Sequence, residues 1–161
     1  MASIAKLSYG TTTGNTWTDA GFTASDFNSR ANGSVVVATT ALDNDSALDL
    51  EAEVSFTFEV GGTTTATSRF HLYILPLDQG GTIYGDDAAT GTTAPADTYW
   101  MATSGVKTGI TSGNKVYGTF PRVPLPAADF KFAIVNSMGA ALDATAAAVV
   151  KYRTVNRNLN G

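Results

Sequence analysis

Residues 50–60 read LEAEVSFTFEV, and their alternation decides the fold class. From Leu50 to Val60 every second side chain is apolar, and glutamate, serine or threonine stands between. This period of two is typical of a β-strand with one face against a core and one face in water. Burying each larger apolar side chain gains about 1.5 to 3 kcal/mol, whereas ordering the backbone costs about 1 to 2 kcal/mol per residue. The strand therefore needs a second sheet over its apolar face, which favours a β-sandwich.

Strand patterns continue on both sides of this segment. Ser34–Thr40 is rich in β-branched residues, and Thr64–Leu75 follows a Gly-Gly turn that is expected to join it to residues 50–60 as a long antiparallel hairpin. Further strands are expected at residues 99–103, 115–120, 130–136 and 146–155. The alanine-rich run 140–148 has helical propensity, but no segment has sustained helical amphipathicity. The patterns predict an all-β, single jelly-roll-like antiparallel β-sandwich of roughly seven to nine strands.

Two other segments depart from regular alternation. Pro121, Pro124 and Pro126 confine the chain around them to an edge strand or an extended crossing, because proline cannot donate to a ladder. Residues 76–97 form a long loop region, of a length that is typical of functional or interface loops.

Residues 1–33 have no sustained period and are expected to form an irregular N-terminal arm, with residues 34–161 as the sandwich domain. Trp17, Phe22 and Phe27 are spread along this arm. The arm is either a loosely packed terminus or a segment that docks on a neighbouring molecule, and large aromatic side chains are wasteful in a free tail. These three residues are therefore interface candidates.

Composition excludes several classes of protein. The 161 residues suit one domain, and a formal net charge of -4 argues against nucleic-acid binding, which depends on lysine and arginine. Cysteine is absent, so disulfides, thiolate metal sites and a cysteine nucleophile are excluded. Residues 1–10 lack the apolar run of a secretory signal, and no apolar run approaches the length of a membrane span. We expect a protein that is made in a cytoplasm and binds neither nucleic acid nor membrane.

No residue pattern predicts catalysis, and we expect no enzymatic activity and no cofactor. His71 is the only histidine and stands on the outward face of a strand, so it is interpreted as a surface residue. Glu51 and Glu53 share a strand face at a spacing that a carboxylate hydrolase could use, but regular alternation on a wet face is typical of ordinary solvation.

Acidic residues gather in two loops, at Asp43-Asn44-Asp45 and at Asp86-Asp87. Loop carboxylates can bind calcium, but Asp and Asn in turns more often bond to their own backbone, and Ala47 stands where an EF-hand loop would place a third ligand. We therefore predict no metal site. Tyr84, Tyr99 and Trp100 could stack on sugar rings, although tyrosine and tryptophan equally anchor protein interfaces.

Three segments carry a family resemblance: LPLDQGGTIYGDD at 75–87, PLPAADFKFAIVNSMGAAL at 124–142 and VVKYRTVN at 149–156. They resemble the jelly-roll head decoration, or cement, proteins of tailed bacteriophages. The resemblance covers about residues 34–156 and leaves the arm unmatched. Gln79 before the first glycine and Ala127-Ala128-Asp129 in place of a Pro-Gly turn depart from the family pattern, and both bear on turn geometry.

The resemblance implies a non-enzymatic virion protein on the outer capsid surface. Such proteins commonly sit as homotrimers that bridge copies of the major capsid protein after head expansion, so those are the expected partners. Trp17, Phe22, Phe27, Tyr84 and Trp100 are the predicted capsid or subunit contacts. The alternative is a glycan- or receptor-binding β-sandwich of a tail fibre or spike, using Tyr84, Tyr99 and Trp100.

Overall fold

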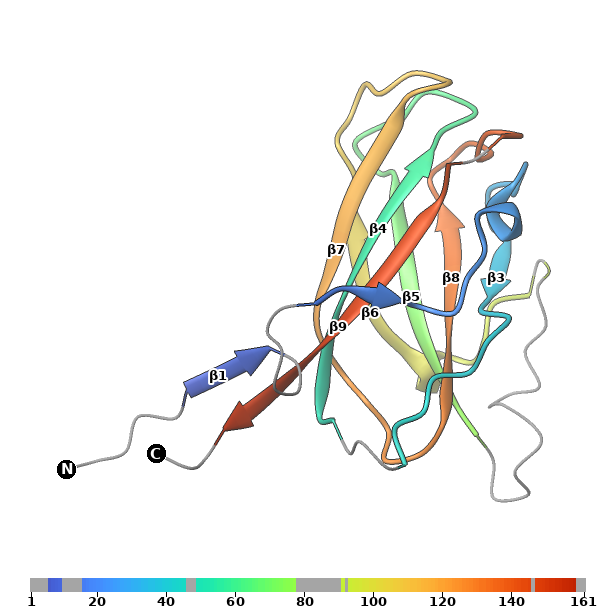
Figure 1. Ribbon diagram of the computed structural model, residues 1–161. Coiled ribbons are helices and arrows are strands. Elements are labelled where there is room, and N and C mark those ends of the chain that lie inside the picture. Colours follow the sequence, from blue (N-terminus) through green and yellow to red (C-terminus); the bar gives the residue numbers. More distant parts are fainter. Residues whose placement is uncertain are drawn as a thin grey trace.

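Two antiparallel sheets pack face to face in the computed structural model, which confirms the predicted all-β sandwich (Figure 1). The structure describes residues 6–9, 16–45, 49–77, 91, 93–145 and 147–158, with the backbone alone for 6–9 and 156–158. Nine strands and two short 3-10 helices lie in these residues. No helix of the described part is long and apolar enough to cross a membrane.

The five-stranded sheet has β4 (Glu51–Glu59) and β9 (Val149–Asn158) at its centre and β7 (Lys115–Pro124) at one edge. On the other side, β1 (Lys6–Tyr9) and β2 (Thr18–Asp19) pair with different stretches of β9. β9 therefore runs beyond residue 155, where the predicted strand ends, because β1 pairs with residues 155–158. In Figure 1, β1 and the end of β9 run together away from the rest of the sandwich.

The four-stranded sheet has the order β3 (Val35–Val37), β8 (Phe130–Ser137), β5 (Arg69–Pro76) and β6 (Trp100–Gly105). Its two central strands bury side chains on both of their faces. On β8, Phe130, Phe132 and Ile134 point into the core, as predicted, while Ala133 and Val135 are buried on the opposite face. Both faces of this sheet are therefore covered, whereas the five-stranded sheet has one wet face.

The predicted alternation is realised from Ala52 to Val60, whereas Leu50, expected on the buried face, lies before β4 and is 64% exposed. Inner residues of β4 are fully buried and the residues between them are partly exposed, which confirms the predicted strand. Phe56 and Phe58 meet Phe70 of the opposite sheet, with ring centroids 5.0 and 4.8 Å apart. These rings lie at the centre of the core, which holds the two sheets together.

The predicted hairpin between residues 50–60 and 64–75 is wrong, because β4 and β5 belong to different sheets. The segment between them crosses the end of the sandwich. Gly61 donates to the carbonyl of Ala141, and Thr64 donates to the carbonyl of Ile110, so the crossing is bonded to two other loops. β4 and β5 contact each other through side chains in the core and are not paired by backbone hydrogen bonds. The run 140–148 forms part of these loops and contains no helix in its described residues.

The segment predicted as an arm contributes to the five-stranded sheet through β1 and β2, and its residues from 18 onward pack on the sandwich. β2 pairs with β9, and the 3-10 helix η1 (Ala24–Phe27) places Phe27 in the core with an exposure of 2%. The ring centroid of Phe27 lies 4.6 Å from that of Phe58 and 5.2 Å from that of Phe22, which is only partly buried. In the described residues, 18–33 therefore pack on the domain that was expected to begin at residue 34.

Edge strand β7 carries the proline-rich crossing. Between Val54, opposite Phe120, and Ala52, opposite Val123, the register shifts by one residue. The shift places a bulge at Pro121 and Arg122, and Arg122 has a φ of 50°. An edge position and a bulge are where strand prolines are tolerated, which confirms the prediction for this segment.

Candidate interaction surfaces

The outer face of the five-stranded sheet exposes an uncharged centre. Tyr117, Thr57 and Val149 lie in one row across β7, β4 and β9, and Thr119, Ser55 and Lys151 form the next row. Tyr117 is 68% exposed and Val149 is 46% exposed. Aromatic and aliphatic side chains between small hydroxyl groups resemble the centre of a protein interface, where charged residues are depleted. We call the five uncharged residues, Tyr117, Thr57, Val149, Thr119 and Ser55, the central patch, and Lys151 lies at its margin.

Charged side chains surround the central patch, and several are neutralised within the chain. Arg153 donates from Nε to Glu53 Oε2 at 2.7 Å, and its Nη2 lies 2.5 Å from the same oxygen. Both side chains are mostly buried, so this pair is more strongly coupled than an exposed one. Lys151 lies 4.0 Å from Asp19, a weaker and more exposed pair. Glu53, one of the carboxylates considered for hydrolysis, is thus held in an ion pair.

Trp17 lies on this same face, beside the central patch. Its ring covers the guanidinium of Arg153, with 4.7 Å from Cζ to the ring centroid. Trp17 also lines a hollow of about 330 Å³ together with Ser55, Phe56, Thr57, Val149 and Lys151. The ion pair with Glu53 orients Arg153, and Arg153 in turn holds the indole ring against the sheet. The predicted interface residue Trp17 is therefore partly buried and fixed in place.

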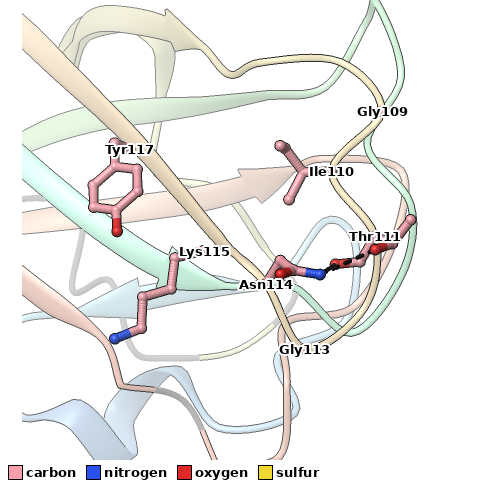
Figure 2. A pocket seen from close by; sticks show the side chains of 7 residues that line it. All are labelled: Gly109, Ile110, Thr111, Gly113, Asn114, Lys115 and Tyr117. Atoms are coloured by element: carbon pink, nitrogen blue, oxygen red, sulfur yellow. Dashed lines mark hydrogen bonds between the residues drawn. The ribbon is translucent and has the colours of Figure 1, made fainter.

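A second hollow, of about 570 Å³, lies where the loop before β7 meets the start of that strand. Figure 2 shows it between the loop 109–114 and the side chains of Lys115 and Tyr117. Asn114 closes the loop by donating from Nδ2 to the carbonyl and hydroxyl oxygens of Thr111. Tyr117 therefore belongs to the central patch and also lines this hollow.

The outer face of the four-stranded sheet is buried in part. Its buried cluster consists of Val35, Tyr73, Leu75, Ala133 and Val135. Tyr99, in the 3-10 helix η3 (Asp97–Tyr99), packs against this cluster, and Gly91 forms a bridge with Val35. Burial and the nearby Asp97 carboxylate raise the pKa of Tyr73. Gly91 of the long loop region predicted from the sequence thus pairs with the edge strand β3, and Tyr99, just after that region, packs on the sheet face.

The predicted aromatic platform is not assembled from Tyr99 and Trp100. Tyr99 is half-buried against the cluster, whereas Trp100 is 46% exposed and lies opposite Tyr73 at the sheet edge. Tyr84 and the Asp86-Asp87 pair lie outside the described residues. Of the predicted interface residues, Trp100 is exposed, Trp17 and Phe22 are partly buried, and Phe27 is a core residue.

His71 lies on the outer face of β5, as expected. Its Nδ1 is 2.7 Å from Oγ1 of Thr103 on the neighbouring strand β6. Burial, and then the charge of Arg69, lower the pKa of His71. Its observed partner is a hydroxyl group, and the Glu53 and Arg153 pair lies on the other sheet.

Two features were missed by sequence reasoning. Tyr117 and Val149 are exposed, and only the strand register shows that they flank Thr57 in one row. The carboxylates of Asp43, Asp45 and Asp129 converge, although Asp129 is far from the others in the sequence. Neither arrangement is indicated by the positions of proline or glycine in the sequence.

Comparison with known proteins adds no relative, since no protein-family model, no curated protein and no solved structure matches this chain.

Proposed function

We propose that the protein is a non-enzymatic capsid decoration protein, which binds the outer surface of a phage head and stabilises contacts between major capsid proteins. The observation that carries the proposal beyond the family resemblance is the central patch. It offers an exposed tyrosine and valine on the outer face of the five-stranded sheet, beside two ion pairs within the chain, Lys151 with Asp19 and Arg153 with Glu53. Such a surface loses little solvation when a protein partner covers it.

Two of the three segments that resemble decoration proteins lie at structurally central positions, and most of the third, 75–87, lies outside the described residues. Residues 130–137 form β8 in the four-stranded sheet, and residues 149–156 belong to β9 in the five-stranded sheet. Residues 124–129 connect the two sheets at one end of the sandwich. The likeness therefore concerns the framework of the domain, and it agrees with a role in which a rigid body presents one face to a partner.

We further propose that the protein acts as a homotrimer on the capsid. Several copies held together would convert modest single contacts into strong attachment, because later contacts form at a high effective concentration. Light scattering on the isolated protein would show a trimer at micromolar concentration. A monomer in solution that also fails to form trimers on the capsid would contradict this part of the proposal.

Co-sedimentation with undecorated, expanded phage heads tests the function. The wild-type protein is expected to bind in a saturable way and to raise the temperature at which the heads release their contents. Tyr117→Glu places a charge in the central patch and is expected to weaken binding at least tenfold. Trp100→Ser, a matched change of an exposed aromatic residue on the other sheet, is expected to bind like the wild type.

The rival function is recognition of a glycan or receptor by a tail fibre or spike. The wild type and the variants above also distinguish it from capsid decoration. A screen against a glycan array is expected to give no specific signal for the wild type. A saturable sugar response that Trp100→Ser abolishes, without any binding to heads, would contradict the decoration proposal and favour the rival.

A further inference from the structure

β1 and the end of β9 form a two-stranded ribbon that projects from one end of the sandwich (Figure 1). The ladder between β4 and β9 ends where Glu51 lies opposite Val155, whereas the ladder between β1 and β9 continues to Asn158. Within the described part of the chain, residues 156–158 therefore pair with β1 alone. We call residues 6–9 and 155–158 the ribbon.

The ribbon lacks the support that keeps a small sheet folded. Among the described elements, β1 makes extensive contact only with β9. Two strands alone are marginally stable in water, and a third strand or a covering layer is needed for a stable sheet. A second molecule can supply both.

Both edges of the ribbon are open within the described residues. β1 is the last strand on its side of the sheet, and residues 156–158 have no strand on the side where β4 lies. The other sheet edges are protected, because β7 has a bulge and prolines, β3 is short and bridged to Gly91, and β6 lies beside β7 of the opposite sheet. The ribbon is therefore the part of the described fold that is best suited to strand addition.

The register makes the ribbon amphipathic. Leu7 lies opposite Arg157, and Tyr9 lies opposite Val155. Residues opposite each other share a face, so three of these four positions have an aliphatic or aromatic residue. The other face has only polar residues, at Lys6, Ser8, Asn156 and Asn158. Because Val155 also lies opposite Glu51, the apolar face of the ribbon continues the outer face of the five-stranded sheet.

We propose that the ribbon binds the ribbon of a second copy of this chain by strand addition. The outer edge of β1 in one copy pairs with the open edge of residues 156–158 in the next copy. Each copy has one edge of each kind, so a ring of copies pairs every edge, and all its ladders remain antiparallel. The apolar faces of the ribbons then cover one another around the axis of the ring.

This proposal rests on the proposed homotrimer and names the contact that assembles it. Three ribbons would close a six-stranded ring without a free edge, and closure is the complete solution to an exposed strand edge. The central patch lies at the opposite end of β9, which begins at Val149, so the two surfaces can bind different partners.

Light scattering on the full chain with two matched variants tests the contact. Leu7→Glu places a charge on the apolar face of the ribbon, and Ser8→Glu places the same charge on the polar face. Leu7→Glu is expected to weaken trimer formation at least tenfold, whereas Ser8→Glu should assemble like the wild type. The carboxylate of Leu7→Glu stands opposite Arg157, so pairing within the ribbon is retained. Circular dichroism should show the same folded sandwich in all three proteins.

Amide hydrogen exchange followed by mass spectrometry locates the contact in the wild type. Amides of residues 6–9 and 156–158 are expected to exchange at least tenfold more slowly in the trimer than at concentrations where the chain is a monomer. Amides of β4 should be equally protected in both states, because they pair within one chain.

A monomer at tens of micromolar concentration would overturn the proposal, and so would an equal effect of Leu7→Glu and Ser8→Glu on assembly. A trimer whose ribbon amides exchange as fast as those of the monomer would also overturn it. Protection that appears only when expanded heads are added would assign the ribbon to the capsid protein instead. Because binding to heads is measured separately, a chain that decorates heads without ribbon contacts would retain the proposed function, and ribbon assembly without head binding would retain this contact.

Discussion

The ring of Phe56 occupies the space above Gly118, its partner across β4 and β7. A Cβ atom at Gly118 would lie 2.6 Å from Cε1 of Phe56 and 2.7 Å from Oγ of Ser104. Gly118 stands on the inner face of β7, between the buried side chains of Val116 and Phe120. The glycine is therefore required by packing in the core, since Phe56 fills the position that its own side chain would take.

Gly118→Ala is expected to destabilise the domain by about 1 to 3 kcal/mol, because the ring of Phe56 must move in a close-packed core. Chemical denaturation monitored by circular dichroism measures the change. Gly105→Ala is the matched control in a strand, since a Cβ atom there meets nothing within 4 Å, and it should change the free energy of unfolding by less than about 0.5 kcal/mol. Equal stability of the two variants would contradict the packing described for Phe56.

Phe27→Ala tests whether the segment before residue 34 belongs to the core. The ring of Phe27 is buried against Phe58, so its removal should cost about 3 to 5 kcal/mol of unfolding free energy. Phe22→Ala removes a ring that is only partly buried and should cost clearly less. If Phe27→Ala unfolds at the same denaturant concentration as the wild type, this segment packs as a detachable arm.

Arg153→Met tests whether Arg153 holds the ring of Trp17 against the sheet. The variant leaves Glu53 without its donor and Trp17 without the cation under its ring, so a loss of about 1.5 to 3 kcal/mol is expected. In a Trp100→Phe background, the fluorescence of Trp17 should shift to longer wavelength as the ring becomes more solvated. Lys151→Met removes only a weak, exposed ion pair and should leave the emission nearly unchanged. A larger emission shift in Lys151→Met than in Arg153→Met would contradict the role of Arg153 in holding Trp17 in place.

His71 makes stability depend on pH below neutrality. Because its folded pKa lies below the ordinary value of 6.5, the unfolded chain binds more protons between these two values. The free energy of unfolding should therefore fall as the pH drops below about 6.5, and His71→Gln should flatten this part of the profile. The Cε1 proton of this single histidine reports the pKa by NMR, and a midpoint at or above 6.5 would contradict the expectation.

Local patterns predicted β3 to β9, because alternation and β-branched residues are visible over a short stretch of sequence, but they missed β1 and β2 in the segment expected to be irregular. The alternation from Leu50 to Val60 predicted β4, and the apolar run from Phe130 predicted β8. The hairpin prediction was wrong because the strands that contain Phe56 and Phe70 both alternate with a period of two, although they lie in different sheets and their rings meet in the core. Such strands can pair in one sheet or face each other across a core, and the short Gly-Gly turn favoured the first arrangement.

The candidate surfaces were less predictable, because they depend on register between distant strands. Exposed aromatic residues were found by type, yet the alternation rule cannot tell that Tyr117 and Val149 share a row through Thr57. The convergence of Asp43 and Asp129 likewise depends on the bridge between Leu42 and Phe130. Pairings of this kind have no signature in a single sequence.

A cryo-EM map of expanded phage heads incubated with the wild-type protein tests the central proposal most directly. The account predicts ordered β-sandwich density at repeated positions on the outer capsid surface, with the outer face of the five-stranded sheet, including Tyr117 and Val149, against the major capsid protein. Bare heads at saturating protein would contradict the decoration function. Decorated heads that leave this face toward solvent would contradict the proposed docking surface while keeping the function.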